Sequence, residues 1–329
     1  MPRRRRYLIS KQTYEITLRA KRGLPFPPSD YMNLLVQGAL ARVQRDEKLS
    51  LCHHVVMTNH FHFLVVVYDQ EQAIRFLQEI KKKLTDIIKR VLGIKHLNLW
   101  ETSSIILCPT EEDVRQRIVY FYSNPAKAHL ESSIELYPGL SSWDAFRSSS
   151  SSISDQVTVS CPWISADNIP VVKQGVSPQR DKQIVEALKE TSRITHDLII
   201  KPNEWMKCFS IPDERVKAIN DDIYHAVKEE EALLSDFRRK EGKGVVSKEA
   251  LKNKAPTLSG HTPKKKGRRI FIVCHDEVIR KQFIDAYNKI CQMCIDCYIW
   301  YRKTFEVVMW PPGTFMPPLP PRVSTLSIY

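Results

Sequence analysis

The chain has 329 residues, of which 43% are hydrophobic, enough for a sizeable core in one large domain or two modest ones. The 50 Lys and Arg residues exceed the 37 Asp and Glu residues by 13, and this formal charge of +13 favours a polyanionic partner, nucleic acid first and an anionic membrane second. Because no apolar run could span a bilayer or serve as a signal peptide, we expect a cytoplasmic protein without a membrane segment whose 8 cysteines stay reduced.

The N-terminal stretch begins with a basic cluster and leads into a strand and a helix. The cluster is either an arm that contacts phosphates or a solvated chain end, and it comprises Arg3, Arg4, Arg5 and Arg6. Residues 13–19 alternate polar and apolar, which predicts a strand with one face on the core and one face in solvent. After several prolines, Ser29 is expected to cap a helix that runs from Asp30 to about Asp46.

Two strands and a long helix are predicted next. The strands lie within residues 49–67 and are broken near Thr58-Asn59. His53 and His54 are adjacent and point to opposite faces; we interpret both as structural, with the alternative that one of them approaches a site. The helix covers residues 70–92 and ends at Gly93. Its outer face carries basic residues, including Lys82 and Lys83, which either are merely solvated or follow a nucleic-acid backbone.

The second of these strands contains two histidines that flank one apolar residue, in the run Asn59-His60-Phe61-His62. Residues two apart on a strand point to the same side, so His60 and His62 project together while Phe61 faces the core. Two neighbouring imidazoles are suited to holding a metal ion, although histidines are also tolerated on the polar face of a half-buried strand.

A further strand around residues 105–107 precedes a helix that begins after Thr110. Acidic residues fill its first turn, and Arg117, Tyr120 and Asn124 share one of its faces. The predicted order is therefore strand, helix, strand, strand, helix, strand, helix. Its first six elements form the split βαβ pattern of an α+β, ferredoxin-like fold.

The remaining chain changes character after Arg147. We expect an N-terminal domain over residues 1–147, a Ser-rich and irregular linker over 148–176, a helical segment over 177–240, a flexible basic segment over 241–269, and a C-terminal helix with a proline-rich tail over 270–329. This later part is expected to be mostly helical. Three cysteines spaced by three lie on the last helix, and we interpret them as buried apolar residues rather than metal ligands: Cys291, Cys294 and Cys297.

The pair of motifs resembles a known family. The Asn59-His60-Phe61-His62 run, followed by a helix with Tyr-x-x-x-Asn-Pro at residues 120–125, resembles the HUH single-tyrosine transposases, and most of all the REP-associated tyrosine transposases (RAYT). The segment 137–143 is also similar to the stretch after the tyrosine helix in that family, so the resemblance covers roughly residues 7–146.

The resemblance implies a metal-dependent enzyme that nicks and rejoins single-stranded DNA beside a hairpin through a 5′-phosphotyrosine. It implies Tyr120 as the nucleophile and His60, His62 and Asn124 as ligands of Mg²⁺ or Mn²⁺. The expected DNA contacts are Arg3, Arg4, Arg5, Arg6, Lys82, Lys83, Arg117 and Lys127. When bound to DNA, such a protein would be associated with the nucleoid.

Some alternatives stay open at the level of sequence. Asn124 precedes Pro125 and would also suit a kink or the cap of a new helix. Tyr122 is a rival nucleophile, but it faces away from Tyr120 on a helix, and the family pattern selects Tyr120. A catalytically silent hairpin-binding protein and a small-molecule metal hydrolase remain alternative functions. The sequence leaves the DNA sequence recognised and the choice between monomer and dimer undetermined.

Overall fold

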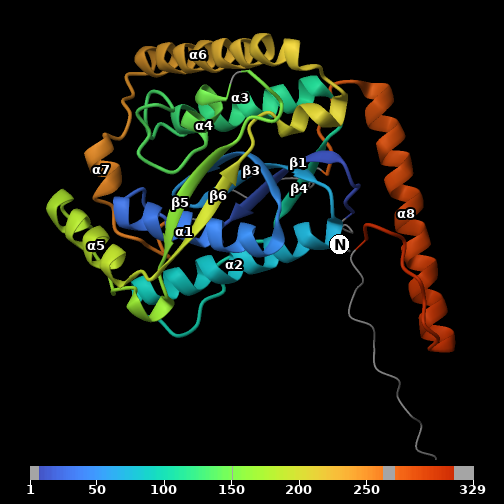
Figure 1. Ribbon diagram of the computed structural model, residues 1–329, viewed down its shortest axis with the longest axis horizontal. Helices are drawn as coiled ribbons and strands as arrows, with labels where there is room; N and C mark the ends of the chain where they lie inside the picture. The colour runs from blue at the N-terminus through green and yellow to red at the C-terminus, as the bar shows by residue number, and fades with distance from the viewer. Residues whose placement is uncertain (1–6, 150, 262–270, 315–329) are drawn as a thin grey trace, which may run out of the picture.

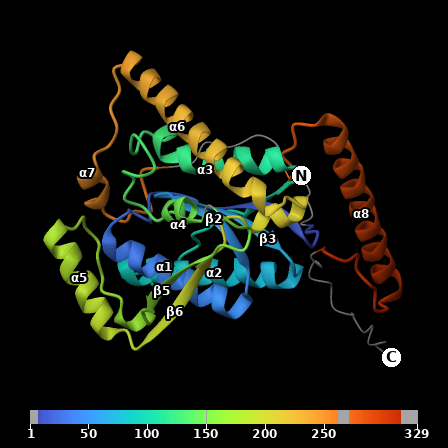
Figure 2. The same ribbon diagram turned by 45° about the horizontal axis from the view of Figure 1, so that its top comes forward.

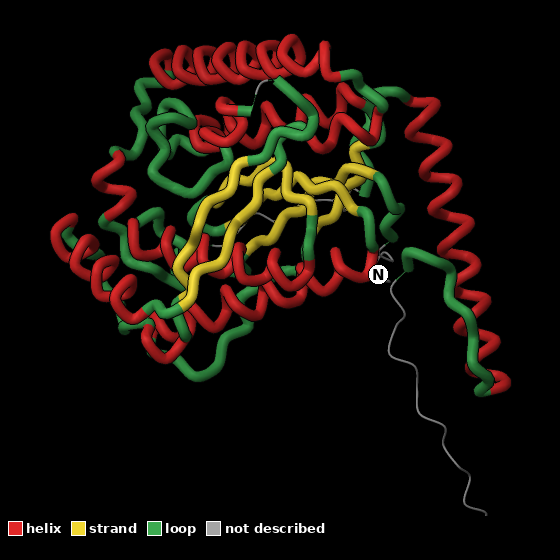
Figure 3. Tube along the Cα trace, viewed as in Figure 1, coloured by secondary structure: helices red, strands yellow, loops and turns green. Residues whose placement is uncertain are grey.

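A mixed sheet of six strands runs through the molecule in the order β4-β1-β3-β2-β6-β5, with helices on both of its faces (Figures 1 and 3). The computed structural model describes residues 7–149, 151–261 and 271–314. The strands are β1 Gln12–Arg19, β2 Ser50–Val56, β3 His60–Val67, β4 Ser104–Cys108, β5 Val157–Trp163 and β6 Ile194–Ile200.

The helices cover the sheet on two sides. In the described residues they are α1 Asp30–Glu47, α2 Gln70–Leu92, α3 Glu111–Lys127, α4 Trp143–Ser148, α5 Pro178–Thr191, α6 Val216–Lys240, α7 Lys248–Lys252 and α8 Glu277–Thr304, with short 3₁₀ turns η1 Ala166–Asn168, η2 Glu204–Phe209 and η3 Asp213–Arg215. The order β1-α1-β2-β3-α2-β4-α3 confirms the predicted sequence of elements. The first four strands pair in the order 4-1-3-2 with antiparallel neighbours, as in a ferredoxin-like sheet.

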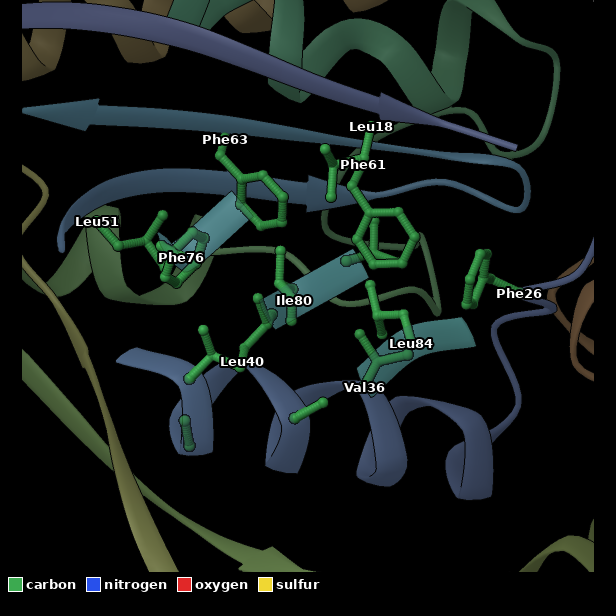
Figure 4. Close-up of a cluster of buried hydrophobic side chains, with 14 of the residues drawn as sticks. Leu18, Phe26, Val36, Leu40, Leu51, Phe61, Phe63, Phe76, Ile80 and Leu84 are labelled. Carbon is green, nitrogen blue, oxygen red and sulfur yellow. The ribbon is translucent and has the colours of Figure 1, made fainter. Parts of the chain in front are cut away.

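One face of the sheet packs on α1 and α2. Phe61 and Phe63 of β3 are fully buried there, and Figure 4 shows them pointing at the apolar stripes of the two helices. The Phe63 ring lies 6.3 Å from the ring of Phe76 on α2, and the Phe61 ring lies 4.8 Å from that of Phe26. This packing determines which way β3 faces, because its alternate residues must then point to the other side.

The other face of the sheet is covered by α3, with α6 lying along α3 (Figure 2). Here β3 presents His60, His62, Leu64 and Val66, and β1 presents the residues that alternate with its core positions. The prediction that β1 has one face in solvent is therefore wrong: Glu15 on that face is only 3% exposed. A polar alternation cannot distinguish a solvated face from a buried polar site.

The second half of the chain extends the same sheet. Residues 157–163, expected to be irregular, form β5. Within the segment 177–240, expected to be helical, α5 ends at Thr191 and the strand β6 begins at Ile194. β6 runs parallel to β2, and the Lys201 amide donates to the Leu51 carbonyl at 2.9 Å. β5 lies at the edge of the sheet, and alternate residues of its first half are exposed. The sequence of this strand therefore has too few apolar residues to be predicted as a strand.

The C-terminal part then crosses to the opposite edge. α6 runs from Val216 to Lys240, and residues 262–270, which include the end of the predicted basic segment, lie outside the described structure. Residues 271–273 lie parallel to β4: the Leu107 amide donates to the Phe271 carbonyl at 2.9 Å, and the Val273 amide donates to the Leu107 carbonyl at 3.1 Å. α8 follows at one side of the molecule (Figure 1).

None of the helices in the described residues combines the length and the apolar character needed to cross a membrane.

Candidate active site

The two histidines of β3 lie side by side on the sheet face beneath α3. In the antiparallel register, His62 pairs with Thr17 and His60 pairs with Arg19 of β1, so all four side chains share one face. The imidazole centroids are 4.9 Å apart. His62 is only 2% exposed, whereas His60 is half-buried. This arrangement agrees with the side-chain direction expected from the strand periodicity.

Each imidazole has its Nδ1 atom next to a side-chain oxygen. His62 Nδ1 lies 3.2 Å from Glu15 Oε1, and His60 Nδ1 lies 2.6 Å from Asn59 Oδ1. A carboxylate only accepts hydrogen bonds, so the neutral His62 carries its proton on Nδ1 and donates it to Glu15. The same tautomer of His60 satisfies Asn59. Both Nε2 atoms then carry lone pairs, the form in which an imidazole binds a metal ion.

Glu15 is the charged centre of this face. Burial alone would raise the pKa of its carboxyl group, but the hydrogen bond from His62, together with the charge of Arg117 and the hydrogen bond from Thr17, lowers the pKa below its usual value. Arg117 Nη1 lies 3.3 Å from Glu15 Oε2. The ionised Glu15 therefore orients His62 with one oxygen and Arg117 with the other, and it links β1 to α3.

Tyr120 projects from α3 toward His62. The two rings meet edge to face with centroids 5.5 Å apart. Arg117 and Lys127 lie near the Tyr120 ring, at 5.6 Å and 5.5 Å from its centroid. Burial raises the pKa of Tyr120, Glu15 raises it further, and Arg117, Arg19 and the Asn124 amide partly offset the rise. The phenol is therefore protonated at neutral pH and needs a base or a cation to become a nucleophile.

Asn124 lies one turn after Tyr120 and also reaches His62. Its amide Nδ2 is 2.9 Å from His62 Nε2. The alternative in which a new helix begins at Pro125 is wrong, because α3 continues through Pro125 to Lys127. Pro125 stands in the last turn of α3, which ends two residues later, so the hydrogen bond that proline cannot donate is lost only at the end of the helix. The Asn124 side chain therefore belongs to the same helical face as Tyr120.

The chemistry of these side chains fits a divalent ion. Within the described residues no group of three or more His, Cys, Asp or Glu side chains could hold a metal, so any site here depends on the imidazoles and an amide oxygen. A half turn of the Asn124 amide about its last side-chain bond exchanges Oδ1 and Nδ2. It would place Oδ1 next to His62 Nε2, where Nδ2 now lies. Two neutral imidazoles and one amide oxygen leave the full charge of the ion available to a phosphate.

Tyr122 occupies a different environment from Tyr120. Its hydroxyl is fully buried, 2.7 Å from His53 Nδ1 and 3.0 Å from the Ser142 hydroxyl. His53 Nε2 in turn lies 3.0 Å from the Pro202 carbonyl. His54 is also buried, and its backbone amide donates to Ser142 Oγ at 2.7 Å. Through these contacts Tyr122 of α3 is joined to β2 and to the loop before α4, and neither His53 nor His54 belongs to the His60–His62 pair.

The predicted DNA contacts are divided between two faces and the undescribed N-terminus. Arg117 and Lys127 lie at Tyr120. Lys82 and Lys83 lie on α2, across the sheet from the two histidines, and Lys83 Nζ is 5.5 Å from the Trp163 ring centroid. Their role in DNA binding stays a prediction. The basic residues Arg3, Arg4, Arg5 and Arg6 lie outside the described residues.

Sequence reasoning missed two residues of this site, Glu15 and Asn59. The signal for Asn59 was its position directly before His60, where a side-chain oxygen reaches the neighbouring imidazole. Glu15 was an acid in the middle of an otherwise strong strand pattern, which is a weak signal unless the covering helix is known.

No family model matches the chain, and no curated protein matches it. Among solved structures, it is similar to a REP-associated tyrosine transposase bound to a REP hairpin, with a TM-score of 0.39 and 22% identity over 45% of this chain and 86% of that one. It is also similar to tRNA(His) guanylyltransferase from Saccharomyces cerevisiae, with a TM-score of 0.30 and 10% identity over 39% of this chain and 64% of the other. Neither likeness, at these values, identifies a reaction for this chain.

Proposed function

We propose that this protein is a metal-dependent enzyme that nicks and rejoins single-stranded DNA next to a hairpin, as the HUH tyrosine transposases do. One observation carries the proposal. A single chain brings Tyr120 edge to face against His62, 5.5 Å between centroids, while His60 and Asn124 flank the same imidazole. The motif resemblance, which rests on the sequence alone, pairs these same residues.

The proposed reaction exchanges one phosphodiester for another. The Tyr120 oxygen attacks the scissile phosphorus, a tyrosyl–phosphate bond forms, and the bond from phosphorus to the 3′ oxygen breaks. The 3′ oxygen leaves as a hydroxyl after it takes up a proton, and the phenol proton is released to solvent or a base. A different 3′ hydroxyl can reverse the step. The number of ester bonds is unchanged throughout, so no ATP is required.

The residues around Tyr120 support this chemistry. A divalent ion held by His60, His62 and Asn124 would act as a Lewis acid on a phosphate oxygen. Arg117 offers a further contact, because its guanidinium lies 5.6 Å from the Tyr120 ring centroid and would place a positive charge near a phosphate held there. Lys127, exposed at the end of α3, adds a second cation near the same ring.

Charge and completeness of the site support a DNA partner and action within one chain. The excess of 13 basic charges matches a polyanionic substrate. Because the imidazoles, the tyrosine and the amide all come from one chain, the site does not need a second subunit to be complete. We propose action in the cytoplasm on nucleoid DNA, with hairpin recognition taken from the motif resemblance. Monomer and dimer are both compatible with this arrangement.

The test is a covalent-capture experiment. Purified protein is incubated with 5′- and 3′-labelled hairpin oligonucleotides that carry single-stranded flanks, with Mg²⁺ or Mn²⁺, and resolved on a denaturing protein gel. We expect a labelled adduct that is absent in Tyr120→Phe and His60→Ala and present in Tyr122→Phe. An adduct that persists in Tyr120→Phe overturns the assigned nucleophile. Hairpin binding without any adduct would instead favour a catalytically silent binding protein.

A further inference from the structure

A pocket of about 330 Å³ lies between α3 and α6, and Tyr120 forms part of its wall. Val119 of α3 and Ile223 and Ala226 of α6 give it apolar surface. Its volume falls at the lower end of the roughly 300–1,000 Å³ found for small-molecule sites. The Tyr120 side chain thus contacts His62 on one side and borders this pocket on another, so a strand attached at the tyrosine would reach the pocket with its next nucleotide.

Polar side chains are arranged around this apolar surface. Gln116 of α3 and Glu230 of α6 line opposite walls, and Lys127 stands at the end nearest the tyrosine. Within the part of the chain that the structure describes, Glu230 makes no hydrogen bond or ion pair, so its carboxylate is available as an acceptor. Gln116 Nε2 donates to Glu112 Oε1 at 2.9 Å, which leaves the Gln116 Oε1 atom as the acceptor. An amide oxygen and a carboxylate accept from the amino groups of adenine and cytosine, whereas thymine offers no exocyclic amino group. A lysine at the mouth suits the phosphate of the next nucleotide.

The far wall of the pocket is held in place by contacts at both ends of α6. Arg115 Nη2 lies 2.8 Å from Asp222 Oδ2 near the start of the two helices. Near their ends, the buried Arg238 donates from Nη1 to the Ala126 carbonyl at 2.8 Å. α6 therefore runs in the same direction as α3 and is fixed to it within the pocket wall at one end and close to the other end of the pocket. A pocket with fixed walls loses little entropy when a base enters it.

We propose that this pocket takes one unstacked, amino-bearing base of the DNA strand next to the cleaved phosphate, with the base between the Tyr120 side and the α6 wall. The inference rests on the proposed function, because the scissile phosphate must lie at Tyr120. It assigns a role in substrate selection to the second half of the chain. Stacking of a base on an aromatic side chain contributes enough for a loss of about 5- to 150-fold in affinity when the contact is removed.

The first experiment measures base unstacking and does not need cleavage. Hairpins carry 2-aminopurine at each flank position in turn, and the Tyr120→Phe protein is added so that the strand stays intact. We expect a fluorescence increase at one flank position. The fluorescence increase should be lost in the double variant Tyr120→Phe/Ala226→Trp, because the tryptophan fills the pocket. It should be kept in Tyr120→Phe/Leu233→Trp, because Leu233 of α6 is 66% exposed and lies outside the pocket lining. No increase at any position, or an increase that survives Ala226→Trp in a folded protein, overturns the inference.

The second experiment measures selection. A hairpin pool with randomised flanks is incubated with the wild type, and covalently captured strands are sequenced. Adenine or cytosine should be enriched over thymine at the position found by fluorescence, by about 5-fold or more, because hydrogen bonds to the base edge carry the discrimination. Ala226→Trp should remove this enrichment, and Leu233→Trp should keep it. Captured strands without a preference at that position overturn the base assignment and leave the proposed function intact. Failure to capture any strand counts against the proposed function, and the fluorescence result alone then decides whether the pocket holds a base.

Discussion

Replacement of Glu15 by glutamine is the most direct probe of how His62 is oriented. Glutamine keeps the shape of the side chain but loses its negative charge. In the ionised glutamate both oxygens accept hydrogen bonds, whereas the glutamine amide could turn its NH₂ group toward His62 Nδ1, which now lies 3.2 Å from Glu15 Oε1. Carboxylates that orient a metal-binding histidine in this way typically contribute 10- to 100-fold to metal affinity. For Glu15→Gln we therefore expect about 1.4–2.7 kcal/mol weaker binding of a divalent ion.

Calorimetric titration with Mn²⁺ measures this effect without any reaction. The matched control is Glu204→Gln, since Glu204 is also buried and ion-paired, 2.9 Å from Lys207, but accepts its other hydrogen bond from Tyr68 rather than from a candidate ligand. We expect weaker binding in Glu15→Gln alone. Equal affinity of Glu15→Gln and wild type would refute the orienting role, and a wild type that binds no Mn²⁺ would refute the metal site itself.

Three further outcomes are expected from the buried contacts of α3. Tyr122→Phe removes a hydroxyl that bonds His53, and we expect a loss of roughly 1–2 kcal/mol of unfolding free energy in urea with DNA adduct formation retained; loss of the adduct in a folded variant would contradict the assignment of the nucleophile. Burial lowers the pKa of His53 to about 3 and of His54 to about 4, from 6.5. The unfolded chain therefore binds protons that the folded chain excludes, so stability is intact above pH 6.5 and falls as the pH drops toward 4. At pH 5.5 each histidine should cost about 1.4 kcal/mol, which urea unfolding at pH 7.5 and 5.5 measures; a His53→Gln variant with an undiminished loss would show the reasoning to be wrong. Arg238→Met removes the charged donor to the Ala126 carbonyl, and we expect a loss of about 1.5–3 kcal/mol of unfolding free energy and faster amide exchange in the last turn of α3. Unchanged amide exchange there would argue against the role of Arg238 in holding α6 on α3.

The order of elements in the N-terminal part could be predicted because each element is patterned by one nearby requirement. Phe61 and Phe63 must face a core, so the intervening histidines face away from it. Thr110 caps α3 with its own hydroxyl, which accepts from the Asp113 amide, and Gly93 ends α2 with a positive φ of 64°. These signals lie within a few residues of the structure that they determine, so cause and effect are visible together in the sequence.

The features that escaped prediction depend on residues far apart in the chain. Ser29 was expected to cap α1, but the amides of Asp30 and Tyr31 are instead bonded by Asp181 of α5, at 2.8 and 2.9 Å. Glu15 looked solvated until α3 was known to cover it. The pocket at Tyr120 has one wall from α6, about a hundred residues later in the sequence, and no local pattern announces that pairing.

The pairing of late segments with both edges of the four-stranded unit has a consequence for synthesis of the protein. The end of β2 pairs early with residues 140–142, but its start at Leu51 stays unpaired until residues 194–200 leave the ribosome. β4 stays an open edge until residues 271–273 emerge. An unpaired edge invites pairing with other chains. The nascent N-terminal half thus carries the complete set of residues around His62 well before its sheet is protected. A shortened gene product that ends after residue 147 would keep these residues but leave β4 and the start of β2 unpaired, and it is expected to aggregate.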